Sequence, residues 1–114
     1  MWQKNNILGL FYESISVNFL ESLGHQIIKT RFKIKTGEVD IISLSQNKII
    51  FFEVKYRKIF EDFEGIVDEK KIKKIFTVVE YFMKNSEFAN YEPQIDLIFI
   101  NKNHQIWHIP NIGI

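Results

Sequence analysis

The sequence predicts a small α/β domain in which one helix, three strands, a second helix and two further strands follow one another. Two segments carry apolar residues at intervals of three and four, which is the spacing of a helix that buries one face. Five shorter segments are alternating or continuous apolar runs typical of strands. A chain of 114 residues can bury one core, so we expect a single domain over residues 1–114.

The first predicted helix covers residues 6–23. Asn5 or Asn6 is expected to cap its start and Gly24 to end it, and His25 is expected to lie at the helix end, where the dipole favours its charged form. The apolar residues that predict the buried face recur every three or four positions: Leu8, Phe11, Ile15, Phe19 and Leu23.

Three strands are predicted next. Over residues 28–35 apolar and cationic residues alternate, so one face should be buried and the other basic. Gly37 permits a turn into a strand at 38–44, and a short polar connection leads to a strand at 48–57, which together form an antiparallel meander. The predicted basic stripe comprises Lys29, Arg31, Lys33 and Lys35.

The second half of the chain completes the order αβββαββ. Residues 58–65 lack periodicity and are predicted to form a loop, and Asp68 is expected to cap a helix that continues to about Asn85. Two strands are predicted at 94–100 and 105–109. The predicted buried face of this helix comprises Ile72, Ile75, Phe76, Val79, Phe82 and Met83.

Composition excludes several kinds of site. The chain has no cysteine, which rules out disulfides, thiol nucleophiles, zinc-thiolate sites and iron–sulfur clusters. Its apolar runs, such as that at residues 49–52, are too short for a membrane span, and no secretory signal is apparent, so we expect a soluble cytoplasmic protein. The net charge of +1 neither favours nor excludes a polyanionic partner, so the placement of charges must decide.

Three ionisable residues lie inside predicted apolar strands. Glu53 and Lys55 are two apart and should share a face, and Asp40 on the neighbouring strand can lie within about 5 Å of them. Asp40, Glu53 and the backbone carbonyl of Val54 could bind one divalent cation, and such oxygen ligands suit Mg²⁺ or Mn²⁺. The alternative is a salt-bridge cluster on a solvated face, although the apolar neighbours of both carboxylates make uncompensated charge costly there.

These motifs resemble those of the bacterial YraN family, whose pattern is GE, GEIDLI, FVEVK-x-R, a helix lysine and FDVV. That family is uncharacterised and resembles the Holliday-junction resolvases of the PD-(D/E)XK nuclease superfamily. The resemblance implies a restriction-endonuclease-like core, with a mixed five-stranded sheet flanked by helices. The matching residues are Glu13, Gly37-Glu38-Val39-Asp40, Phe52-Glu53-Val54-Lys55-Tyr56-Arg57, Lys71 and Ile95-Asp96-Leu97.

The resemblance also implies roles for single residues. Asp40 and Glu53 would be catalytic metal ligands, and Lys55 would orient or deprotonate the attacking water and contact the scissile phosphate. Glu13 would be an accessory catalytic carboxylate and Lys71 a supporting phosphate contact, although both also suit solvated helix positions. The implied chemistry is phosphodiester hydrolysis assisted by Mg²⁺ or Mn²⁺, with no small-molecule cofactor.

The basic residues predict a nucleic-acid surface. The four cations of the stripe, with Arg57 and Lys71, could follow a phosphate backbone, although edge lysines that deter aggregation are the competing explanation. The family's usual residues at 31, 33 and 94 are Asn, Arg and Arg, whereas this chain has Arg31, Lys33 and Gln94. We expect structured or branched DNA as the partner, with RNA not distinguished, and by resemblance a homodimer.

The sequence therefore predicts a Mg²⁺-dependent DNA endonuclease. A catalytically silent nucleic-acid-binding module in DNA repair or recombination is the first alternative, and a protein-interaction domain is the second. His104 and His108, four residues apart, form a weaker candidate for a metal site. Trp2 and Trp107 are interpreted as packing residues.

Overall fold

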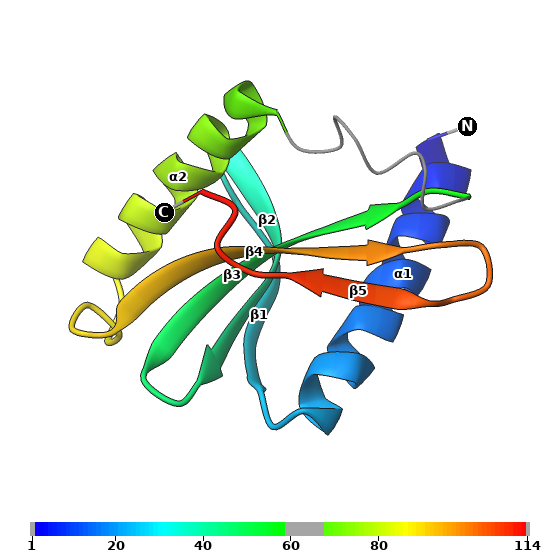
Figure 1. The fold of residues 1–114 in the computed structure, drawn as a ribbon. Helices are drawn as coiled ribbons and strands as arrows, with labels where there is room; N and C mark the ends of the chain where they lie inside the picture. The colour runs from blue at the N-terminus through cyan, green and yellow to red at the C-terminus, as the bar shows by residue number, and fades with distance from the viewer. Residues whose placement is uncertain (1, 59–67, 114) are drawn as a thin grey trace.

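A computed structural model describes residues 2–58 and 68–113 (Figure 1), with side chains from Ile7 onward. The predicted loop at 58–65 lies, apart from Lys58, outside the described residues. The observed order confirms αβββαββ. The elements are α1 (Trp2–Ser22), β1 (Gln26–Ile34), β2 (Gly37–Ser45), β3 (Lys48–Tyr56), α2 (Glu69–Lys84), β4 (Glu92–Ile100) and β5 (Ile106–Ile109).

The strands form one mixed sheet in the order β1-β2-β3-β4-β5. β1, β2 and β3 are the predicted antiparallel meander. β4 lies parallel to β3 after a crossover that contains α2, and β5 is antiparallel to β4. This five-stranded α/β arrangement with two helices is consistent with the restriction-endonuclease-like core that the sequence predicts.

The two helices cover opposite faces of the sheet (Figure 1). Adjacent residues of β3 show this division, because Phe51 packs in the core under α2 and Phe52 in the core under α1. The α2 side comprises Val39, Ile42, Ile49, Phe51, Ile75, Val78, Val79, Phe82 and Ile95. The α1 side comprises Leu20, Ile41, Ile50, Phe52, Ile98 and Ile100.

α1 differs from the prediction at its start and along its face. It begins at Trp2, so neither Asn5 nor Asn6 caps it. Leu8 and Phe11, predicted to be buried, are 45% and 46% exposed. The helix ends at Ser22, and Gly24 stops it as expected, because its φ of +94° is a left-handed conformation that glycine adopts readily. No helix in the described part of the chain is long and apolar enough to cross a membrane.

β1 does not keep the predicted alternation. An irregularity between Ile27 and Lys29 shifts its register against β2, and Arg31 adopts a φ of +50°. A bulge and a residue in the left-handed conformation each interrupt the alternation of side chains between the two faces of a strand. Thr30 is consequently exposed, although the alternation predicts it on the buried face. The four predicted cations of the stripe are all exposed.

α2 begins where the sequence predicts. The Asp68 side chain caps it by accepting the N–H of Lys71 at 2.7 Å. Its buried face includes Val78, which the sequence analysis missed, whereas Phe76, predicted to be buried, is 39% exposed. Gly37 is required for packing and not for the turn at 35–36, because a Cβ there would lie 2.6 Å from the carbonyl oxygen of Lys74.

Candidate metal and nucleic-acid site

The candidate site lies where β2 and β3 separate. Their ladder extends only as far as Ile41, which pairs with Phe52. The Asp40 Oδ2 atom then accepts the backbone N–H of Val54 at 2.7 Å. Asp40 and Glu53 are therefore not paired in the ladder, but their side chains lie close together, because the charge of Glu53 and a side-chain hydrogen bond with it both act on Asp40. A carboxylate instead occupies the position of a strand carbonyl, and this places Asp40 at the opening between the strands.

Glu53 is held by two lysines from different elements. It is 4% exposed, and its Oε2 atom lies 3.1 Å from Lys55 Nζ and 3.2 Å from Lys71 Nζ. Lys55 is on the same face, as its spacing of two residues along β3 predicts. Lys71 comes from the first turn of α2, which the Asp68 cap positions. The structure thus brings Lys71 to the carboxylate, in contrast to the solvated position that was the alternative for it.

The charge of Glu53 opposes the ionisation of Asp40. Burial is the main cause that raises the pKa of Asp40 to about 7, and the charge of Glu53 raises it further. The N–H of Val54 acts in the opposite direction, because it stabilises the ionised carboxylate. A cation between the two carboxylates would relieve the repulsion and favour the ionised form of Asp40.

Glu13 joins the site from α1. It lines a pocket of about 200 Å³ together with Asp40, and its Oε1 atom lies 3.7 Å from Nε of Arg31. Burial raises the pKa of Glu13, and the charge of Arg31 opposes this shift. We call this cavity the α1 pocket; it is lined by Leu8, Gly9, Tyr12, Glu13, Asp40, Val54 and Tyr56.

The donor set fits a hard divalent cation that keeps part of its water shell. In the described residues no three acidic or histidine side chains converge on one point as a ready-made metal cage. Mg²⁺ commonly binds through one or two carboxylates and retains several waters. Asp40 and Glu53, with the carbonyl of Val54 as a further oxygen ligand, would hold Mg²⁺ or Mn²⁺ in this way.

The predicted basic stripe divides between the two sides of the sheet. Arg31 contacts Glu13 of α1, whereas Lys33 and Lys35 lie beside α2. There they line a groove of about 260 Å³ that also includes Lys71 and Lys74. We call this the lysine groove, after its four members Lys33, Lys35, Lys71 and Lys74. Because Lys71 also contacts Glu53, the groove adjoins the acidic site.

The remaining predicted cations are outside the groove lining. Lys29 is exposed on β1. Arg57 donates from Nη1 to the carbonyl oxygen of Tyr56 at 2.7 Å, so its guanidinium is held at the end of its own strand. Sequence reasoning missed Lys74 of the groove, although its spacing of three from Lys71 on a predicted helix places both on one face.

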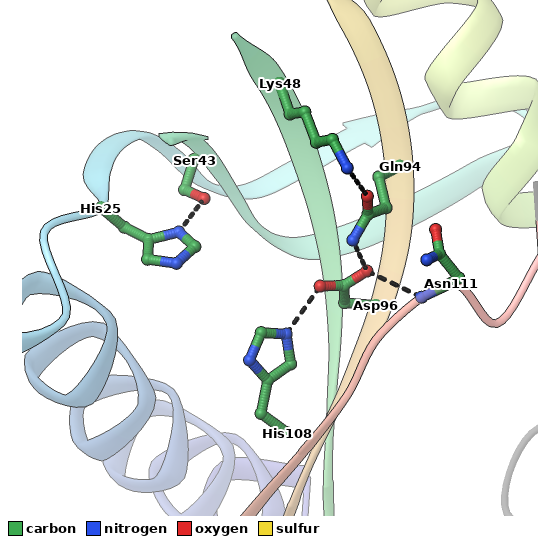
Figure 2. Close-up of polar contacts among 7 residues, drawn as sticks. All are labelled: His25, Ser43, Lys48, Gln94, Asp96, His108 and Asn111. Atoms are coloured by element: carbon green, nitrogen blue, oxygen red, sulfur yellow. Dashed lines mark hydrogen bonds and ion pairs between the residues drawn. The ribbon is translucent and has the colours of Figure 1, made fainter. Parts of the chain in front are cut away.

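A second polar cluster surrounds Asp96 of β4 and is shown in Figure 2. Asp96 is fully buried, and it accepts hydrogen bonds from Gln94 Nε2 at 2.8 Å and the Asn111 backbone N–H at 3.1 Å. His108 Nε2 lies 2.6 Å from its other oxygen. Gln94 in turn accepts from Lys48 Nζ at 3.0 Å. Every oxygen of this buried carboxylate thus has a partner.

The histidines do not form the metal site that their spacing suggested. His108 contacts Asp96, whereas the ring of His104 packs against Phe11 of α1 at 5.4 Å. His25 lies just past the end of α1, as expected, but its surroundings oppose the charged form that the helix dipole favours. Its Nδ1 lies 2.9 Å from the buried Ser43 hydroxyl, and burial, reinforced by the nearby charge of His108, lowers the pKa of His25.

Comparison with known proteins identifies relatives along most of the chain. The model of the uncharacterised protein family UPF0102 matches residues 12–100. A UPF0102 protein of Sulfurihydrogenibium sp. is 33% identical over 105 residues, which cover 90% of each chain. UPF0102 proteins of Caldanaerobacter subterraneus and Campylobacter jejuni are each 35% identical, and the matches cover 84% and 92% of this chain and 80% and 92% of theirs. The names of these relatives state no function.

Proposed function

We propose that this chain, which belongs to the uncharacterised protein family UPF0102, is a metal-dependent endonuclease that hydrolyses phosphodiester bonds in DNA. One observation carries the proposal. The charge of Glu53 disfavours ionisation of Asp40 at the opening between β2 and β3, and two lysines contact Glu53. Paired carboxylates beside lysines are the groups that metal-assisted phosphoryl transfer requires.

The residues divide the chemistry between them. A bound Mg²⁺ or Mn²⁺ would polarise the phosphoryl oxygen and lower the pKa of a coordinated water. Asp40 and Glu53 would supply its carboxylate ligands. Lys55, whose side chain is 26% exposed, can donate a hydrogen bond to the attacking water or to a phosphoryl oxygen. Lys71, 40% exposed, can balance the negative charge that develops on the phosphate.

The lysine groove supports a nucleic-acid substrate. Lysines along a groove neutralise phosphates without reading sequence, which gives binding that weakens as salt rises. Lys71 belongs both to the groove and to the acidic site. A strand whose backbone lies in the groove would therefore bring a phosphodiester to Asp40 and Glu53. Branched or otherwise structured DNA is the substrate class we propose.

A catalytically silent nucleic-acid-binding module is the second candidate. The observation that favours it is the pair of lysines on Glu53, because they neutralise this carboxylate without a cation. In that function the lysine groove would bind the backbone, and the acidic residues would serve stability alone. The two candidates differ in turnover and not in binding.

Incubation with labelled DNA in Mg²⁺ or Mn²⁺ tests the proposal. The panel contains a four-way junction, a flap, a nicked duplex, an intact duplex and a single strand. We expect cleavage that EDTA abolishes and that Asp40→Asn and Lys55→Ala reduce at least about 100-fold, the size of loss typical for one group that stabilises a transition state. Lys84→Ala, an exposed lysine at the end of α2, is the matched control and should cleave normally.

The same experiment separates the two candidates. Salt-dependent binding without cleavage in either metal would overturn the endonuclease and select the silent module. Cleavage that survives in Asp40→Asn would show that the activity comes from elsewhere or from a contaminant. Light scattering on the same preparation tests the proposed homodimer, and a monomer at working concentration would contradict it.

A further inference from the structure

α1 contains a glycine, Gly9, that the helix conformation does not require. Gly9 lies in the second turn, where glycine costs roughly 0.5–1 kcal/mol relative to alanine. A Cβ at Gly9 would meet no atom of the described residues within 4 Å, so none of them requires the missing side chain. In contrast to Gly37, which α2 approaches closely, Gly9 has space beside it in the described structure. Gly9 is also one of the residues that line the α1 pocket, so a larger side chain at this position would stand in the pocket wall.

The α1 pocket is walled mainly by apolar and aromatic groups. Tyr12 of α1 and Tyr56 of β3 stack with their centroids 4.4 Å apart and their planes at 15°. Leu8 and Val54 contribute apolar surface, and the volume of about 200 Å³ suits one flat aromatic group of moderate size. Asp40 lines the same pocket, so whatever enters it lies next to the carboxylate proposed to hold the cation.

We propose that the α1 pocket binds a single unpaired nucleobase of the substrate strand, with the adjoining phosphate at Asp40 and Glu53. The inference rests on the proposed function and narrows its substrate class to DNA with unpaired nucleotides. Bases stack on aromatic side chains without regard to sequence, because every base has a π-face. The base and the phosphate of a nucleotide are attached to the same deoxyribose, so a base beside Asp40 places a phosphodiester near the acidic site.

The proposal restricts the form of the nucleic acid. A base in an intact duplex is paired and stacked, and it cannot enter a side pocket unless it is extruded at a cost of a few kcal/mol. A single strand, a flap or the unpaired nucleotides at a branch present the base without that cost. The pocket therefore favours DNA with unpaired nucleotides over an intact duplex.

Binding without turnover tests the pocket independently of the nuclease. Fluorescence anisotropy in EDTA compares two labelled strands of equal length and charge, oligothymidylate and an oligomer of abasic tetrahydrofuran units. Stacking of one base corresponds to a factor of about 5 to 100 in affinity, so the abasic strand should bind weaker by at least about fivefold. Equal affinity for the two strands, or no binding of either, would overturn the proposal.

Substitution of Gly9 locates the effect. Gly9→Leu fills open space and raises helix propensity, so we expect a folded protein that has lost at least about fivefold of its affinity for oligothymidylate. Its affinity for the abasic strand should be unchanged. Gly9→Ala, which adds one methyl group, is the control and should bind nearly as the parent does.

The outcomes separate the pocket from the catalytic proposal. A preference for oligothymidylate that Gly9→Leu leaves intact would overturn the α1 pocket as the base site, whatever the protein cleaves. A preference that Gly9→Leu abolishes, in a protein that never cleaves DNA, would keep the pocket and remove the nuclease. Circular dichroism of both Gly9 variants checks that the helix content is retained.

Discussion

Two buried carboxylates on neighbouring parts of the sheet have opposite surroundings. Asp96 is fully buried and accepts hydrogen bonds from Gln94 and Asn111, with His108 on its other oxygen (Figure 2). Asp40 accepts one backbone N–H and faces Glu53, which raises its pKa. The first environment surrounds its charge with hydrogen-bond partners, whereas the second offers one backbone donor and a neighbouring charge of the same sign.

This difference distinguishes a structural carboxylate from a functional candidate. A buried charge is tolerated where donors surround it, and such networks hold the core in one arrangement. A carboxylate kept near another carboxylate costs stability, and perturbed acids of this kind concentrate at functional sites. Asp96 belongs to the same sequence resemblance as Asp40, but only the structure shows that their surroundings differ.

Loss of the Asp96 carboxylate should give the largest effect on stability. Asp96→Ala removes the acceptor for Gln94, His108 and the Asn111 N–H, and leaves the buried Gln94 amide without this partner. We expect the free energy of unfolding to fall by about 4 kcal/mol, as when one partner of a buried pair is removed. Urea denaturation measures this. Asp40→Ala is the comparison and should cost less than about 1 kcal/mol, and equal costs would remove the contrast between the two sites.

The pH dependence of stability should expose the unbalanced charge of Asp40. Its pKa is about 7 in the folded protein and 3.8 in its unperturbed state. Between these values the folded state binds a proton that the unfolded state lacks, so the stability contributed by this group is present below pH 4 and is lost as pH rises through 7. Asp40→Asn keeps an acceptor for Val54 and removes the titration.

The comparison of parent and Asp40→Asn isolates this group, because the shifts at Glu13 and His25 are present in both proteins. We expect Asp40→Asn to gain up to about 4 kcal/mol in unfolding free energy relative to the parent between pH 4 and pH 8, measured in EDTA. A difference between the two proteins that does not change with pH would show that Asp40 titrates normally.

The sequence predicts the helices and strands better than it predicts the contacts between them. The order of helices and strands follows from apolar periodicity, which is local, and so do the Asp68 cap and the shared face of Glu53 and Lys55. Thr30 and Phe76, predicted to be buried, are exposed, and both differences have local causes. A bulge in β1 exposes Thr30, and a shift of the buried face of α2 exposes Phe76.

The site required information that spacing does not contain. An ideal ladder predicts that Asp40 faces its partner across the strands, whereas it bonds the Val54 N–H where β2 and β3 separate. Lys71 contacts Glu53 only because a crossover brings α2 to this face. Gly9 gives a sequence signal, a glycine inside a helix, but its meaning depends on the pocket beside it.

A divalent cation should reverse the electrostatic cost at Asp40 and leave the Asp96 cluster unaffected. A cation that binds only the folded state stabilises it by about 1.4 kcal/mol at ten times its dissociation constant. We expect Mg²⁺ or Mn²⁺ at pH 7.5 to raise the unfolding free energy of the parent by about this amount and that of Asp40→Asn much less. Thermal melts at several metal concentrations measure it, and equal shifts in both proteins would place the cation elsewhere.

The smallest predicted effect concerns the lysine groove, because each exposed lysine acts weakly. Lys33→Ala and Lys74→Ala each remove one charge that lines the groove, and neither contacts Asp40 or Glu53 in a described ion pair. If each lysine neutralises one phosphate, the slope of log affinity against log salt should become shallower by about 0.9 for duplex DNA and about 0.7 for a single strand. Anisotropy titrations at several salt concentrations give the slope. Lys84→Ala at the far end of α2 should leave it unchanged, and an equal change in this variant would mean that the protein attracts DNA through its total charge and not through the groove.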